Sequence, residues 1–157
     1  MTTITIPPEY GYVLLTTSLT AFNSFWHGAR VTSYRKAAKI PYPTAYADSG
    51  HFAAASSDPS KKQALHLFNC VQRAHGNFLE NQAAFLATLL VAGIDTPVTA
   101  TVLGLGWNLG RIVYALGYTR TDKEGGKGRL AGSFFWLAQF GLYGLTAWSG
   151  AKVAGLV

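Results

Sequence analysis

Charged side chains are scarce in this sequence, and the few present gather in short stretches. They make up 13% of the 157 residues, about half the share expected of a soluble domain. Four segments have at most two Lys, Arg, Asp or Glu residues, and each can cross a hydrocarbon layer of about 30 Å. The scarcity of charge therefore predicts an integral membrane protein. The four segments are 10–29, 63–94, 96–119 and 130–151.

Cysteine is nearly absent, which removes several kinds of site. The single Cys70 allows no internal disulfide. His66 lies one helical turn away, but two candidate ligands without a further Cys or His cluster do not make a zinc site, so no metal is expected. The net charge of +6 comes from two basic loops rather than from a basic stripe interleaved with aromatics. This distribution argues against a nucleic-acid partner.

Prolines and short polar stretches divide the chain into four predicted helices within one domain, 1–157. The short lead has no basic stretch, so we expect the first apolar run to be a retained helix rather than a signal peptide. Pro41 and Pro43 end the first helix in a polar loop. Pro97 suits the first turn of the third helix, which follows the second in an antiparallel hairpin. The helices are predicted at about 9–36, 61–94, 97–118 and 130–152.

The predicted fold class is all-α: an antiparallel bundle of four transmembrane helices. Gly106 and Gly110 have the four-residue spacing at which small residues let membrane helices approach closely. Lys and Arg residues concentrate in and beside the loops 37–60 and 119–129, whereas the second loop has none. The positive-inside rule therefore places both basic loops in the cytosol.

The most informative stretch is 66–80, in the second helix. Its polar side chains fall on one face roughly 100° wide, and Arg73 and Glu80 stand two turns, about 10 Å, apart. Ionisable residues in a membrane helix mark a functional site by default. The alternative is a structural network in which an intermediary such as Asn77 joins the charges. The residues on this face are His66, Asn69, Cys70, Arg73, Asn77 and Glu80.

A second polar patch lies on the third helix, where Arg111, Tyr114 and Tyr118 share one face. The alternative interpretation is an interfacial aromatic belt with a snorkelling arginine. We expect both patches near the cytosolic end, where basic groups converge around one carboxylate. Because Arg binds carboxylates in a bidentate manner, the expected guest has a head with more carboxylates than ammonium groups. An apolar reactant could enter from the membrane lipids.

The stretch FNCVQRAHGNFLE, together with EYGYVLLT, RKAAKIPYP and GLGWNLGRIVYALGY, resembles the MAPEG family. These are membrane-associated proteins in eicosanoid and glutathione metabolism, and the likeness is greatest to the microsomal glutathione transferase branch. The resemblance covers nearly the whole chain. It implies a homotrimer in the endoplasmic reticulum that binds glutathione as substrate between subunits. It also implies that glutathione reacts as a thiolate with lipophilic electrophiles and reduces lipid hydroperoxides.

The same resemblance assigns roles to individual residues. Arg129 matches the arginine that activates the glutathione thiol, with Lys127 as its competitor because the 119–129 loop varies in length across the family. Gln72 and Asn81 replace tyrosines of some relatives, which argues against leukotriene synthesis more than against glutathione binding. The positions that match glutathione-binding residues are Arg35, Arg73, His75, Asn77, Glu80, Tyr114 and Tyr118.

Three other functions stay open. The chain is a non-catalytic lipid-binding or scaffold protein, a glutathione-dependent isomerase of oxygenated lipids, or a small channel or transporter. The retained set of Arg73, Asn77 and Glu80 argues against the first. Whether glutathione is consumed or recycled separates transfer from isomerisation. The lack of interrupted helices argues against a transporter.

Overall fold

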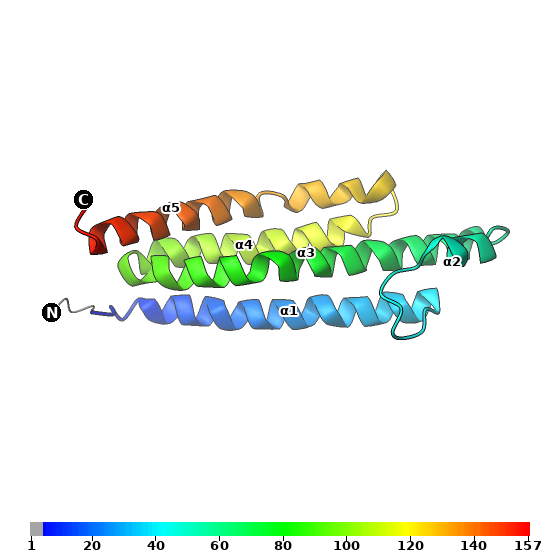
Figure 1. The fold of residues 1–157 in the computed structure, drawn as a ribbon, viewed down its shortest axis with the longest axis horizontal. Coiled ribbons are helices and arrows are strands. Elements are labelled where there is room, and N and C mark those ends of the chain that lie inside the picture. The colour runs from blue at the N-terminus through cyan, green and yellow to red at the C-terminus, as the bar shows by residue number, and fades with distance from the viewer. Residues whose placement is uncertain (1–4) are drawn as a thin grey trace.

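The computed structural model describes residues 5–157, and these residues are mostly helical with no β-strand. Four long helices lie side by side, and two shorter helical segments occupy the connections at one end (Figure 1). The predicted all-α class is confirmed. The long helices are α1 (Tyr10–Ala38), α3 (Pro59–Asp95), α4 (Pro97–Tyr118) and α5 (Phe135–Val153). The short segments are α2 (Ser49–Ala54) and the 3-10 segment η1 (Glu124–Gly132).

Successive long helices alternate in direction. The start of α1 and the end of α5 lie at one end of the molecule, and α2 and η1 lie at the other (Figure 1). Only Thr96 separates α3 from α4, so these two helices form a tight antiparallel pair. Both basic loops therefore occupy one end, where α3, at 37 residues the longest helix, projects beyond its neighbours (Figure 1).

Capping residues and prolines mark the ends of the long helices. The side chain of Asp58 accepts a hydrogen bond from the Lys61 amide at 2.9 Å, and Pro59 occupies the first turn of α3. Pro97 takes the same position in α4. At the end of α1, Lys39 adopts a left-handed conformation with φ of 53°, and its amide caps the last turn.

One helix of the described residues, α3, is long and apolar enough to cross a membrane. Its most apolar stretch of 18 residues has a mean hydropathy of 1.2. The other three predicted spans do not meet this test. They nevertheless carry large apolar side chains outward: Phe22 and Phe25 of α1 are 74% and 78% exposed, and Leu137 of α5 is 76% exposed. Apolar surface of this extent is a feature of proteins that contact lipid or partner chains.

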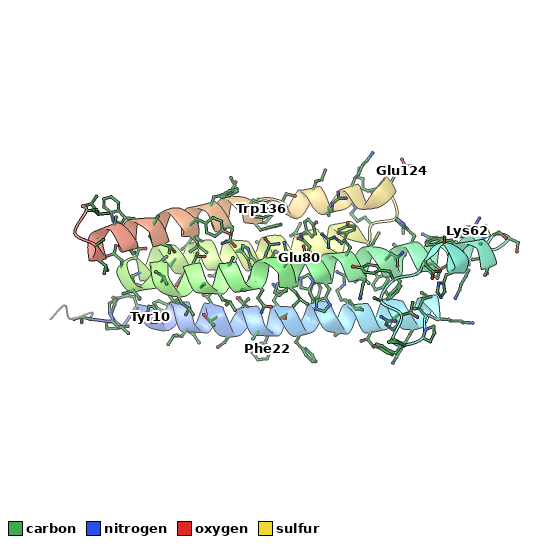
Figure 2. All side chains as sticks on the ribbon, in the orientation of Figure 1. Tyr10, Phe22, Lys62, Glu80, Glu124 and Trp136 are labelled. Atoms are coloured by element: carbon green, nitrogen blue, oxygen red, sulfur yellow. The ribbon has the colours of Figure 1, made fainter. Side chains whose placement is uncertain are left out.

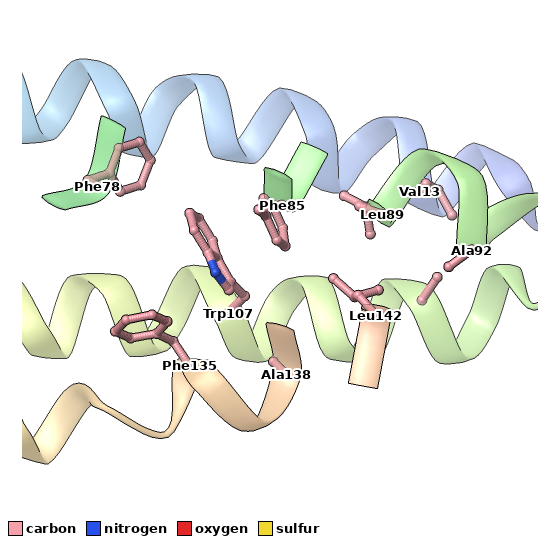
Figure 3. Packing of buried hydrophobic residues seen from close by; sticks show 10 residues of the cluster. Val13, Phe78, Phe85, Leu89, Ala92, Trp107, Phe135, Ala138 and Leu142 are labelled. Carbon is pink, nitrogen blue, oxygen red and sulfur yellow. The ribbon is translucent and has the colours of Figure 1, made fainter. Parts of the chain in front are cut away.

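The main core lies where α3, α4 and α5 meet the first half of α1 (Figure 3). At its centre Trp107 stacks on Phe85 with ring centroids 3.8 Å apart, and neither side chain is exposed. Polar bonds cross the same interior: Asn23 donates to the Asn108 side chain at 3.1 Å, and Asn108 donates to Thr20 at 2.9 Å. Such interhelical amide and hydroxyl bonds are typical of membrane helices.

The segment predicted as an open loop over 37–60 contains a helix, α2. The Asp48 carboxylate caps it by accepting from the His51 amide at 3.0 Å, and the His51 ring lies against Asp48 in return. These bonds hold the pKa of Asp48 below its usual value. A reciprocal cap of this kind stabilises even a short helix, and its signal in the sequence is a single Asp–His spacing.

The last long helix begins later than predicted, at Phe135 instead of residue 130. Gly125 and Gly126, inside the 3-10 segment η1, have φ values of 59° and 68°, and these positive values prevent a regular helix from starting there. Its compact path is possible because Gly132 lies directly against the backbone of Tyr114 in α4. The extra turn brings residue 129 beside α4 rather than leaving it in a solvent loop.

The glycine contacts of α4 differ from the predicted Gly106–Gly110 pair. A Cβ on Gly106 would meet nothing within 4 Å, so this glycine makes no close helix contact within residues 5–157. A Cβ on Gly110 would come within 2.8 Å of Phe135, and one on Gly104 within 2.8 Å of Thr16. Helical periodicity identified the small residues, but only the position of the neighbouring helices decides which of them permit close approach.

Candidate functional site

The column of charge predicted on α3 is an ion pair. Arg73 Nη1 donates to Glu80 Oε1 at 2.7 Å and Nη2 donates to Oε2 at 3.3 Å. Both side chains are about half exposed, at 49% and 52%. An exposed ion pair contributes little to stability, so fold stability is a weak reason for two charges at this depth in an apolar helix. Each of the two side chains is accessible enough to exchange the other for a group of a bound molecule.

Asn77 joins this pair to the next helix. Its Nδ2 donates to Glu80 Oε2 at 3.3 Å, and its Oδ1 accepts from Nη1 of Arg111 at 2.9 Å. Two cations, one carboxylate and one amide therefore form a continuous chain from α3 to α4. The expectation that an intermediary joins Arg73 to Glu80 is wrong, because these two side chains meet directly; Asn77 instead links Glu80 to Arg111.

Arg111 is the buried end of the chain, with no exposed surface. Aromatic rings surround its guanidinium, and its Nε and Nη2 groups have no hydrogen-bond partner in residues 5–157. Ring faces attract a cation but do not accept its N–H groups as well as oxygen does. The nearest rings belong to Phe135 at 4.3 Å, Tyr114 at 5.2 Å, Trp107 at 5.5 Å and Phe78 at 5.6 Å.

Tyr114 and Tyr118 connect this chain to η1. Their rings meet edge to face with centroids 5.6 Å apart. The Arg129 guanidinium lies over the Tyr118 ring at 5.0 Å, and its Nη1 donates to the carbonyl oxygens of Gly125 at 3.4 Å and Gly126 at 3.0 Å. Lys127, its competitor, is exposed. The turn of η1 thus holds Arg129, rather than Lys127, against the tyrosine face.

The site lies deeper than the sequence predicts. Figure 2 places Glu80 near the middle of the long axis, with Lys62 and Glu124 toward the end that carries the basic loops. Arg73 is 14 residues beyond the first residue of α3, about 21 Å at 1.5 Å per residue. The α3 part of the site therefore extends from the expected end toward the middle of the bundle, because α3 projects past its neighbours and its residue numbers overstate nearness to the end.

Two residues expected with this group face elsewhere in the chain. His75 stacks on His27 of α1 with ring centroids 6.4 Å apart, since two residues of helix turn it away from Arg73. Arg35 is 6% exposed, and its guanidinium donates hydrogen bonds to backbone carbonyls between α1 and α2. Neither joins the charged chain of α3 and α4.

A cavity of about 450 Å³ opens beside η1, on the side of the basic loops. His66 lines it, and one turn further Cys70 lies 3.4 Å from the His66 ring. Within residues 5–157 no three His, Cys, Asp or Glu side chains gather in a way that could hold a metal. The cavity is lined by Gln63, His66, Leu67, Arg120, Thr121, Lys123, Glu124 and Gly125.

The fold and the site define a class: a membrane-associated helical protein with a chain of arginine, amide and carboxylate groups between two helices. The MAPEG family model matches residues 13–148, which is most of the chain. The chain therefore belongs to the MAPEG family, whose members include glutathione transferases, peroxidases and isomerases as well as non-catalytic proteins.

Sequence reasoning missed Tyr46 and gave Arg111 no binding role. Arg111 was placed in the second polar patch with the tyrosines, but only its contacts with Phe135 and Asn77 show that it is buried and joined to the α3 residues. Tyr46, between α1 and α2, lies close to Arg73 over the bare backbone of Gly76. No periodic pattern marks a residue in a connecting segment.

Proposed function

We propose that this MAPEG protein is a membrane glutathione transferase of the microsomal glutathione S-transferase 3 type, which also reduces lipid hydroperoxides with glutathione. The observation that carries the proposal is the chain Arg73–Glu80–Asn77–Arg111, with Arg129 held on the neighbouring tyrosines. It combines carboxylate-binding arginines with one carboxylate that can hold an ammonium group. Glutathione carries both kinds of group.

The charges of the site and of the guest are complementary. Arg73, Arg111 and Arg129 with Glu80 give two net positive charges. Glutathione as a thiolate has two carboxylates, one ammonium and one sulfur anion, hence two net negative charges. When glutathione binds, Arg73 exchanges Glu80 for a ligand carboxylate, and Glu80 takes the ligand ammonium. The half-exposed position of both side chains supports such an exchange.

Arg129 is the proposed catalytic residue, because it is the cation free to face the sulfur. A thiol with a pKa near ~8.5 is only a few per cent ionised at neutral pH. Lowering the pKa by about two units, or ~2.7 kcal/mol of preference for the anion, makes the thiolate the main form. The Arg129 guanidinium is held by backbone oxygens and the Tyr118 ring, neither of which neutralises its charge.

The thiolate then reacts with an apolar partner from the lipid. In transfer, sulfur forms a bond to the electrophilic carbon of the partner, and the leaving group or the ring-opened oxygen takes the electron pair. In peroxide reduction, two glutathione molecules become the disulfide while the hydroperoxide becomes an alcohol and water. Neither route needs a nucleophile from the protein.

The remaining features of the proposal follow the family. The protein forms a homotrimer in the endoplasmic reticulum membrane, with four spans and the loops 37–60 and 119–129 in the cytosol. The shared location of both loops and the outward apolar residues of α1 and α5 support this arrangement. Tyr114 and Tyr118 line the glutathione site, whereas His75 faces α1 and has a packing role in this proposal.

One experiment tests the function. Purified protein in detergent is given glutathione with a chlorinated aromatic electrophile or with a lipid hydroperoxide, in parallel. We expect enzyme-dependent consumption of glutathione in both. Rearrangement of an oxygenated lipid without glutathione loss would favour the isomerase, and binding of lipid without any turnover would favour the scaffold. Either result would reject the transferase.

A further inference from the structure

The chain between α1 and α2, residues 39–48, is fastened to α3 by an amide clamp; we call these residues the strap. The Ala47 amide donates to Asn69 Oδ1 at 2.8 Å, and Asn69 Nδ2 donates to the Ala47 carbonyl at 2.8 Å. Ala47 is only 5% exposed. One side chain thus satisfies both backbone polar groups of the buried residue Ala47. This pair of bonds fixes the position and the orientation of the strap relative to α3.

Arg35 fastens the other half of the strap. Its Nη1 donates to the carbonyl oxygens of Pro41 at 3.3 Å and Thr44 at 2.6 Å. The rings of Tyr42 and Phe68 flank its guanidinium at 4.3 and 4.7 Å. A buried arginine used in this way holds backbone in place, which is the reason why it does not join the charged chain. The strap is therefore rigidly placed by contacts at both ends.

The clamp positions Tyr46, the residue before Ala47, next to the α3 residues of the charged chain. The Tyr46 hydroxyl lies 3.8 Å from the point where a Cβ on Gly76 would stand, and Arg73 Nη1 lies 3.9 Å from the same point. Both groups therefore lie over the bare backbone of Gly76. Tyr46 is 42% exposed, so a ligand can approach its side chain.

We propose that Tyr46 is a further glutathione-binding residue, whose hydroxyl donates to the carboxylate that Arg73 binds, and that Asn69 is the positioning residue that holds it there. The inference rests on the proposed glutathione site. A neutral donor beside a guanidinium adds a second contact to the same carboxylate without adding charge. Gly76 provides the space: alanine would make only ordinary contact there, whereas a larger side chain would displace Tyr46.

The test is calorimetric binding of glutathione by the purified protein in detergent. Tyr46→Phe should weaken binding roughly ten-fold, since one hydrogen bond to a charged group is lost. Tyr42→Phe is the matched control: it removes a hydroxyl from the same strap, keeps the ring on Arg35, and should bind as the wild type does. With the two glutathione monoethyl esters, each blocking one carboxylate, the Tyr46→Phe deficit should vanish for one ester.

A second variant tests the clamp. Asn69→Leu should speed hydrogen exchange of residues 40–48 in the absence of ligand and weaken glutathione binding. Its combination with Tyr46→Phe should bind no more weakly than the poorer single variant, because both remove one contact. Additive losses, or a Tyr46→Phe deficit that persists with both esters, would overturn the inference. Wild-type protein that binds no glutathione rejects the proposed function instead, whereas equal binding by wild type and Tyr46→Phe rejects only the role of Tyr46.

Discussion

Arg111 and Asn77 share one hydrogen bond, 2.9 Å from Nη1 to Oδ1, and it is the sole hydrogen bond of the guanidinium within residues 5–157. Arg111 has no exposed surface, while Asn77 also donates to the half-exposed Glu80. Asn77 is therefore the residue that connects the exposed Glu80 carboxylate to the buried Arg111 guanidinium. Its amide orientation is set by Arg111 on one side and by Glu80 on the other.

Asn77→Ala should destabilise the protein more than Arg111→Met does. The alanine leaves a buried cation with no oxygen partner, a cost of about 1–3 kcal/mol. The methionine removes the charge and fills an aromatic box with an apolar side chain, which is often tolerated. Thermal unfolding in detergent without glutathione measures both. The double variant should be as stable as Arg111→Met alone; a double variant as unstable as Asn77→Ala would contradict this account.

Glu80→Gln should weaken glutathione binding at least ten-fold with little change in thermal stability. An exposed ion pair contributes little to folding, but the neutral amide can no longer attract the ligand ammonium. Asp95→Asn is a matched control, because it neutralises the carboxylate of another exposed ion pair, 2.9 Å from Lys152 and away from the site. Calorimetry compares the two. Equal affinity of Glu80→Gln and wild type would remove Glu80 from the site.

The helical periodicity of the sequence accounts for the α3 part of this site. Arg73, Asn77 and Glu80 share a face because a helix of regular period places them there, and the structure joins them by hydrogen bonds. Apolar length and prolines likewise indicate where long helices form. Properties that depend on one helix alone are therefore readable from a single sequence.

Features that depend on contacts between distant segments were not readable. The Tyr46 hydroxyl and Arg73 Nη1 both lie over Gly76, and the Asn69 bond to Ala47, 22 residues away, holds the chain next to Tyr46. Arg111 turns inward because Phe135 of α5 packs against it. The 3-10 segment that precedes α5 follows its path because Gly132 lies against the backbone of Tyr114 in α4. In each case the sequence shows the residue type, while tertiary packing decides its direction.

Arg129→Ala should keep glutathione binding and lose thiolate formation. The cation favours the anionic sulfur, so it lowers the thiol pKa; without it the titration midpoint of bound glutathione should return toward ~8.5. The thiolate absorbance in the ultraviolet, recorded from pH 5 to 10, measures the midpoint directly. Lys127→Ala is the control, since Lys127 is exposed and its loss should leave the midpoint unchanged. A midpoint shift in Lys127→Ala alone would transfer the role to that residue.

Gly132→Ala should impair both the fold and the chemistry, whereas Gly106→Ala should be close to neutral. A Cβ on Gly132 would collide with the backbone of Tyr114, which cannot yield without moving η1 away from α4. Overpacking of this kind costs about 1–3 kcal/mol. A Cβ on Gly106 would enter open space. Because Arg129 lies in η1, the displaced segment should also raise the thiol pKa of bound glutathione. Thermal unfolding and thiolate titration of the two alanine variants test the link, and an unfolding loss in Gly132→Ala with an unchanged titration would show that η1 does not position Arg129.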